Sequence, residues 1–159
     1  FRRSQSSGAI LGGKNDKLLE KFSNHAKALF VGDVVPTNEA DTFEFKFTVE
    51  CKFYKDMENF KKLFERDNRI WGWYDEARID AAKIDKAPLL IFKFNHTDVY
   101  CALDAKYSTP LTITTMVNLY RDVETKMIDI GRYTNSDILR MFKFDEALKD
   151  TNWWKREAK

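Results

Sequence analysis

The sequence has little of what marks several specialised classes of protein. Only two of its 159 residues are cysteines, Cys51 and Cys101, which argues against a disulfide-stapled scaffold and predicts two buried free thiols in a reducing cytoplasm. No apolar run approaches the roughly 18–20 residues that cross a membrane, and no signal-peptide pattern is visible, so no membrane partner is expected. There is also no internal repeat and no low-complexity stretch.

An excess of charge of one sign is missing as well. Lys and Arg number 27 against 25 Asp and Glu, a net charge of +2, so any basic surface for nucleic acid must come from uneven distribution. The first 14 residues are uneven in this way, because Arg2, Arg3 and Lys14 occur there without an acid. With 43% hydrophobic and 14% aromatic residues, the chain has enough apolar material for one domain with a core.

The clearest pattern that is present is the strict alternation of residues 42–54, TFEFKFTVECKFY. A period of two predicts a β-strand with one buried face, formed by the apolar positions from Phe43 to Phe53. Cys51 belongs to that apolar set. Glu50 and Lys52 share the other face, about 6.6 Å apart along the strand.

A short apolar run upstream, residues 29–35, contains Asp33 directly after Gly32. A carboxylate in such a run is costly to bury unless it is paired or bound to a metal. The alternative is an Asp at a turn or bulge that Gly32 makes possible. An Asp on one strand and Glu-x-Lys on the next can form a divalent-metal site with a lysine beside it.

The rest of the pattern predicts a mixed β-sheet flanked by helices, of the α/β class, with a helical C-terminal tail. Residues 112–122 are ambiguous. The tail is expected to hold a short helix that Asn135 or Ser136 caps and that ends at Phe142, and a second at 145–156 with the packed pair Trp153 and Trp154. The other expected elements are helices at 15–28, 55–66 and 70–85, and strands at 89–95, 99–103 and, at an edge, 127–130.

The residues at the strand pair suggest a chemistry. Asp33 and Glu50 would repel each other at close range, and Mg²⁺ relieves this with carboxylate, carbonyl and water ligands. The backbone carbonyl of Cys51 is the natural third protein ligand. Such an ion polarises a phosphoryl oxygen, while Lys52 would hold or activate the attacking water and neutralise developing charge. The sequence therefore predicts metal-assisted phosphodiester hydrolysis, although an α/β domain with a salt-bridged strand pair remains the alternative.

Several motifs resemble the PD-(D/E)xK nuclease superfamily, and most closely its Holliday-junction-resolvase-like branch from phages and archaea. The resemblance implies a restriction-endonuclease-like core with a basic N-terminal arm over residues 1–104, and a C-terminal extension, residues 105–159, packed on the same domain. The matching segments are Arg2-Arg3-Ser4, Ser7-Gly8-Ala9, Gly32 to Pro36, Val49 to Lys52, Trp71, Trp73 and Ala77, and Ala87 to Phe92.

This resemblance also implies roles for individual residues. Asp33 and Glu50 would be metal ligands, Lys52 the catalytic lysine, and Glu20 a further catalytic carboxylate on a helix. The sequence departs from the pattern at two places, because Gly32 replaces the leading proline and Glu76 is the nearest candidate for a helical glutamine. The expected DNA contacts are Arg2, Arg3, Ser7, Lys14 and Lys55.

The expected cofactor is Mg²⁺, with Mn²⁺ as a substitute, and the expected partners are branched or duplex DNA and, by analogy, a second copy of the chain. The resemblance places such an enzyme in the cytoplasm of a bacterial or archaeal host, with a phage gene as one source. Two alternatives stay open. One is a homing- or restriction-type endonuclease on the same core, and the other is a non-catalytic DNA-binding protein of this fold.

Overall fold

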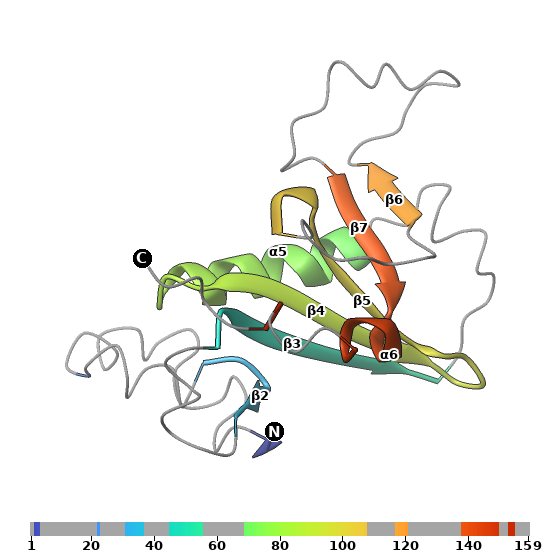
Figure 1. The fold of residues 1–159 in the computed structure, drawn as a ribbon, viewed down its shortest axis with the longest axis horizontal. Helices are drawn as coiled ribbons and strands as arrows, with labels where there is room; N and C mark the ends of the chain where they lie inside the picture. The colour runs from blue at the N-terminus through green and yellow to red at the C-terminus, as the bar shows by residue number, and fades with distance from the viewer. Residues whose placement is uncertain are drawn as a thin grey trace.

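The computed structural model describes residues 2–3, 22, 31–36, 45–55, 69–107, 117–120, 138–149 and 153–154. Most of these residues belong to one β-sheet and the two α-helices that pack on it (Figure 1). In chain order the elements are β1 Arg2–Arg3, β2 Val34–Val35, β3 Phe47–Tyr54, α5 Arg69–Ala82, β4 Ala87–Phe94, β5 Val99–Asp104, the 3-10 helix η2 Ala105–Tyr107, β6 Val117–Tyr120, β7 Ile138–Lys143 and α6 Phe144–Ala147.

The sheet has seven strands in the order β1-β2-β3-β4-β5-β7-β6. Strands β3 and β4 are parallel and are joined through α5, whereas every other neighbouring pair is antiparallel. A parallel pair needs a crossover, and a helix is its usual form. The mixed α/β sheet that the sequence predicts is therefore confirmed.

The two faces of the sheet are covered by different parts of the chain. Helix α5 packs on one face, where the Trp73 ring lies 6.4 Å from the rings of both Phe92 and Phe94. On the other face the Trp153 ring lies 4.6 Å from Phe47, and Trp154 packs beside it. The predicted packing role of the tryptophan pair is confirmed, since both side chains are buried.

Helix α5 follows the predicted apolar stripe closely. Ile70, Tyr74, Ala77 and Ala81 recur at helical spacing and are all buried, which holds this face of the helix against the sheet. The helix ends where Asp85 adopts a positive φ of 53° and the Lys86 N–H donates to the Ala81 carbonyl at 3.1 Å. This is a Schellman-type C-cap with Asp in place of the usual glycine.

Tyr74 ties α5 to two strands through its phenol oxygen. This oxygen accepts a hydrogen bond from the Asp104 N–H at 2.8 Å and donates to the Pro88 carbonyl at 3.5 Å. We expect Tyr74→Phe to lower the free energy of unfolding by about 1–3 kcal/mol, because a buried N–H loses its acceptor. Chemical denaturation would measure the loss. Tyr54→Phe, which removes the hydroxyl of a partly exposed ring, should change stability by less than about 0.5 kcal/mol.

The predicted helical tail is wrong for the described part of residues 105–159. The segment expected to be helical up to Phe142 contains strand β7, and the ambiguous segment contains β6. Strand β7 pairs with β5 and buries Leu139, Met141 and Phe142, so burial in the sheet outweighs a local helix-cap signal. Of the expected terminal helix, the described residues show the single turn α6, and Trp153 and Trp154 lie in a turn.

Other predictions meet the structure as follows. Strands β4 and β5, joined by the turn at Asn95 and His96, confirm the expected hairpin. Both cysteines are free thiols, but Cys51 is exposed where burial was expected, whereas Cys101 is buried. Of the helix expected at 15–28 only Phe22 is described, in a bend. The helix expected past residue 55, at 56–66, and the edge strand at 127–130 lie outside the described residues. Within those residues no helix is long and apolar enough to cross a membrane.

Candidate active site

Strand β3 carries the candidate site at the point where its environment changes. Phe47 and Val49 are buried, but the next two positions on the same face, Cys51 and Phe53, are exposed. The sequence predicted burial along this whole face, so the expectation is wrong for its second half. The reason is that Trp153 and Trp154, which cover this face, pack only on the first half of the strand, at Phe47.

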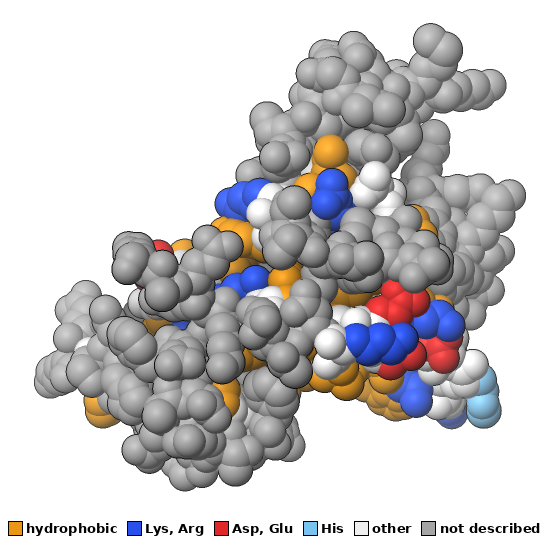
Figure 2. Space-filling view, viewed as in Figure 1, with side chains coloured by type: hydrophobic (Ala, Val, Ile, Leu, Met, Phe, Trp, Pro, Cys, Tyr) orange, Lys and Arg blue, Asp and Glu red, His pale blue; other side chains and the backbone are white. Residues whose placement is uncertain are grey.

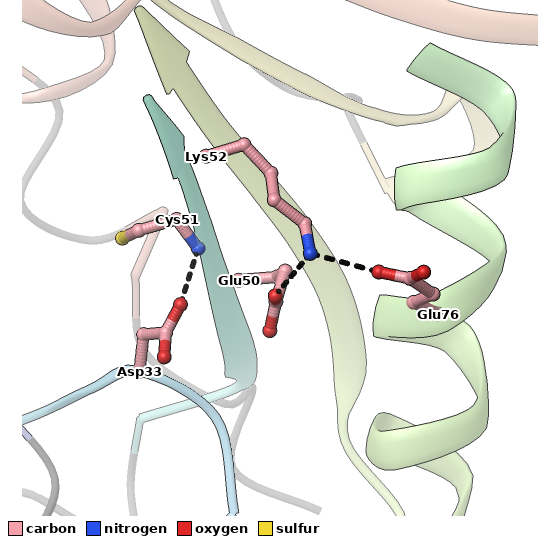
Figure 3. Close-up of polar contacts among 5 residues, drawn as sticks. All are labelled: Asp33, Glu50, Cys51, Lys52 and Glu76. Carbon is pink, nitrogen blue, oxygen red and sulfur yellow. Dashed lines mark hydrogen bonds and ion pairs between the residues drawn. The ribbon is translucent and has the colours of Figure 1, made fainter. Parts of the chain in front are cut away.

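Asp33 lies at a bend before β2, the strand that pairs antiparallel with β3. The Asp33 N–H donates to the Val49 carbonyl at 2.7 Å, and one Asp33 carboxylate oxygen accepts from the Cys51 N–H at 2.8 Å (Figure 3). Backbone and side chain are thus both fastened to the edge of β3. Asp33 therefore has both predicted features: it lies in a bend with Gly32, and it faces the strand that carries Glu50 and Lys52.

Gly32 makes that placement possible. Its φ is +85°, and a Cβ there would lie 3.0 Å from the Val49 carbonyl oxygen and 3.0 Å from the Thr48 methyl carbon. A proline, the residue that the resembled motif carries here, has φ near −65° and cannot adopt this conformation. The departure from the motif is therefore part of how this chain aims Asp33.

We expect Gly32→Ala to lower the free energy of unfolding by about 1–3 kcal/mol, through the strained φ and the contacts with Val49 and Thr48. It should also weaken metal binding, because Asp33 is displaced with the bend. Thermal unfolding and titration calorimetry with Mg²⁺ would measure the two effects. Gly72 is the matched control, since a Cβ there meets nothing within 4 Å in α5. Gly72→Ala should stabilise by about 0.5–1 kcal/mol, and equal effects of both changes would contradict the expectation.

Glu50 projects from β3 toward the α5 side of the sheet and is half-buried. Burial raises the pKa of its carboxyl, the hydrogen bond from Lys52 lowers it, and the nearby Asp33 charge raises it, with a net increase. The negative charges of Glu50 and Asp33 are therefore close enough to repel each other. That is the electrostatic situation in which a divalent cation is favoured.

Lys52 joins the strand to helix α5. Its Nζ lies 3.0 Å from a Glu50 oxygen and 2.8 Å from a Glu76 oxygen, so it bridges two carboxylates (Figure 3). Burial lowers the pKa of Lys52, but the hydrogen bonds to Glu76 and Glu50 outweigh this and the net pKa is raised. Lys52 is therefore a stable cation at neutral pH.

The donor set suits Mg²⁺. Asp33 and Glu50 supply two carboxylates, and in an extended strand the Cys51 carbonyl points to the same edge as the Cys51 N–H that Asp33 binds. Mg²⁺ is commonly held by one or two carboxylates with several waters. No cluster of three or more His, Cys, Asp or Glu side chains occurs among the described residues, so these two carboxylates carry the fit.

The remaining predicted site residues are only partly described. Arg2 and Arg3, expected in a loop, form strand β1, and Arg3 pairs with Val34, the residue after Asp33. Residues 2 and 3 therefore lie beside the candidate site. Lys55 is exposed directly after β3. Ser7, Lys14 and Glu20 lie outside the described residues.

Sequence reasoning named Glu76 as a candidate but did not pair it with Lys52. The signal was its position on the edge of the α5 stripe, and the pairing depends on how α5 packs over β3. The exposure of Phe53 was missed altogether, because alternation identifies a face of a strand and does not identify what covers it.

Comparison with known proteins gave one match. The family described as "Phage putative PDDEXK endonuclease" has a model that matches residues 1–155. The match continues past residue 104, where the resemblance drawn from the motifs ended, so strands β6 and β7 are part of the family sequence. No curated protein and no solved structure matches the chain significantly.

Proposed function

This chain belongs to the phage putative PDDEXK endonuclease family, a family of phosphodiester hydrolases, and on that premise we propose that it is a Mg²⁺-dependent DNA endonuclease. In this proposal Asp33, Glu50 and Lys52 form the catalytic site, on a core of the restriction-endonuclease type. Mn²⁺ would substitute for Mg²⁺, because both ions accept carboxylate and carbonyl ligands.

One observation carries the proposal. Asp33, at the bend before β2, lies beside strand β3, which carries Glu50; each carboxylate has a defined position, and Lys52 lies 3.0 Å from Glu50. A protein that only bound DNA would gain nothing from two like charges beside one another, since both repel phosphate. The arrangement favours a catalytic role over the non-catalytic alternative.

Each residue has a separate task. Asp33 and Glu50 would hold the ion, with the Cys51 carbonyl as a third protein donor. A bound Mg²⁺ supplies polarisation of a phosphoryl oxygen and acidifies a bound water. Lys52, as a stable cation, donates hydrogen bonds to the attacking water or to a phosphate oxygen and stabilises negative charge there. It cannot serve as a general base while it is protonated, so of the two roles predicted for it we favour holding over activation.

The same proposal extends to substrate and assembly. The likeness of the N-terminal and core motifs to junction resolvases supports branched DNA as the preferred substrate. Cutting both strands of such a substrate needs two active sites, which supports a homodimer. The pairing of β1 with β2 supports a phosphate-contacting role for Arg2 and Arg3, because it brings these two residues to the Asp33 edge.

A cleavage assay tests the proposal. The protein is incubated with Mg²⁺, Mn²⁺ or EDTA and with a four-way junction, a flap, single-stranded DNA and linear duplex. We expect metal-dependent cutting that is fastest on the junction, with paired symmetric nicks. Absence of metal-dependent cutting on every substrate contradicts the nuclease proposal. Cutting of the linear duplex at one sequence favours a restriction-type enzyme, and sedimentation velocity tests the dimer.

A further inference from the structure

The uncovered half of the sheet lies beside the candidate active site. We define the open sheet face as Cys51 and Phe53 on β3, Ile91 and Lys93 on β4, and Val99 on β5. Strand register places these side chains on one face, since Cys51 pairs with Ile91, Phe53 with Lys93, and Lys93 with Val99. The Trp153 and Trp154 cover does not reach them, and each is exposed or half-buried.

Phe53 is the most prominent member of this face. Its side chain is 63% exposed, although it follows Lys52 directly in β3. Phe47, on the same face of the same strand, is almost completely buried. An aromatic ring left in water next to a proposed catalytic lysine gives up the apolar burial that the rest of the strand obtains.

The charges around Phe53 favour one kind of occupant. Lys93, its register partner, and Lys55, two residues along the chain, are both exposed, and neither forms an ion pair with any residue that the structure describes. Asp98 in the adjacent hairpin is balanced by Lys143 at 2.7 Å. Figure 2 looks onto this side of the molecule and shows hydrophobic and basic side chains next to each other at the corner with the β4–β5 hairpin, beside a group of mixed acidic and basic side chains.

A protein surface docked here would have to desolvate Lys93 in the middle of the contact. A nucleic-acid strand satisfies both features, because phosphates pair with lysines and every base has a face that stacks on an aromatic ring. Phe53 is three residues beyond Glu50, about 10 Å along the strand, and its side chain projects from the opposite face of the sheet. A DNA strand that crosses the edge of β3 beside the scissile phosphate can therefore place a neighbouring nucleotide on Phe53.

We propose that Phe53 is a stacking platform for an unpaired base next to the cleavage position, with Lys93 and Lys55 holding the adjoining phosphates. In duplex DNA the bases are stacked on each other and cannot reach the ring. The open sheet face therefore selects DNA with unpaired nucleotides. This inference rests on the proposed nuclease function and narrows its substrate class to branched DNA in which nucleotides are unpaired at the branch point.

Fluorescence anisotropy tests it with Ca²⁺ in place of Mg²⁺, on single-stranded, flap and fully paired DNA. We expect Phe53→Ala to lower affinity about tenfold for DNA with unpaired nucleotides and to leave affinity for paired DNA unchanged. Phe53→Trp should keep wild-type affinity, because the ring remains. Ile79→Ala is the matched control, as Ile79 is 64% exposed on α5, and it should change nothing.

A lysine variant separates stacking from charge. Lys93→Ala should weaken binding of both kinds of DNA by a similar factor and reduce the salt dependence by about one charge. Equal affinity of Phe53→Ala and wild type for all DNA would overturn the inference, as would an equal loss on paired and unpaired DNA. A change from dimer to monomer in Phe53→Ala, without a change in DNA affinity, would assign the face to a second copy instead.

The two proposals fail in different ways. If the wild-type protein neither binds nor cuts any DNA, the proposed function is wrong. If wild type cuts with Mg²⁺ and Phe53→Ala binds unpaired DNA as well as wild type does, only the stacking inference is wrong. Thermal unfolding of each variant checks the fold, and an exposed ring should be removable without loss of stability.

Discussion

Glu50→Gln is expected to abolish Mg²⁺-dependent DNA cleavage and, at neutral pH, to make the metal-free protein more stable. Gln has nearly the same shape but carries no charge, so one of the two carboxylates at the site is lost. The rate should fall about 1,000-fold or more, which corresponds to several kcal/mol of lost charge stabilisation. Rate measurements with saturating metal and titration calorimetry separate lost chemistry from lost metal binding.

The gain in stability follows from the sign of the pKa shift. The pKa of Glu50 in the folded protein is raised above its ordinary value, mainly by burial. A raised carboxyl pKa means that ionisation opposes folding, so the cost is fully present above the folded pKa and is absent below the unfolded pKa near 4.5. Glu50→Gln should therefore raise Tm at neutral pH and have little effect near pH 4.

Asp75→Asn provides the matched control for this experiment. Asp75 is a partly exposed carboxylate on α5 in an ion pair with Arg78, so its neutralisation should alter neither cleavage nor Tm by a measurable amount. If Glu50→Gln cleaves at the wild-type rate, Glu50 is not a ligand. If it lowers Tm at neutral pH, the bridge to Lys52 contributes more than the cost of burying the charge.

The parts of the fold that could be predicted from sequence are those whose signal is local. Strand β4, strand β5 and helix α5 each carry their own period, and the Asn95-His96 turn separates the two strands. Asp33 and the Glu-x-Lys strand could be connected because β2 and β3 are adjacent in sequence and in the sheet. Because the two segments are close in sequence, their residue pattern alone was enough to predict the contact between Asp33 and β3.

The parts that could not be predicted depend on distant contacts. Strand β7 is defined by its pairing with β5 and by Trp153 against Phe142, at 6.0 Å, and a local cap at Ser136 gave the opposite signal. The exposure of Phe53 depends on where the C-terminal tryptophans stop. The Lys52–Glu76 bridge depends on the rotation of α5 over the sheet. A period identifies a face, and only tertiary packing decides what that face meets.

Lys52 bridges Glu50 and Glu76, and its replacement is the second change for which we expect a large effect on the cleavage rate. Lys52→Met keeps the length of the side chain and removes the charge, and we expect it to lower the cleavage rate about 100- to 1,000-fold, the usual loss when one stabilising donor is removed. Metal affinity should be retained, because Asp33 and Glu50 are still present. Single-turnover rates on a four-way junction, together with metal titration, would measure both quantities.

The pH dependence of the wild-type rate distinguishes the two roles that a lysine can have. A lysine acting as a general base must lose its proton near the working pH, so the rate would rise as it deprotonates. The pKa of Lys52 is raised by its bonds to Glu76 and Glu50, although burial opposes this, so it stays charged throughout the range in which the enzyme is assayed. We therefore expect no rise in rate between about pH 7 and pH 9 that depends on Lys52. Lys52→Arg keeps the cation, so its rate should have the same pH dependence as the wild-type rate.

Glu76→Gln tests how Lys52 is positioned, because it keeps a hydrogen-bond acceptor for Lys52 and removes one of its two negative partners. Glu76 is 62% exposed, so the stability change should stay below about 1 kcal/mol. If Glu76 only positions Lys52, the rate should fall far less than in Lys52→Met, and the double variant should be no slower than Lys52→Met alone. Losses that multiply in the double variant would mean that Glu76 acts on substrate or metal by itself and not through the lysine.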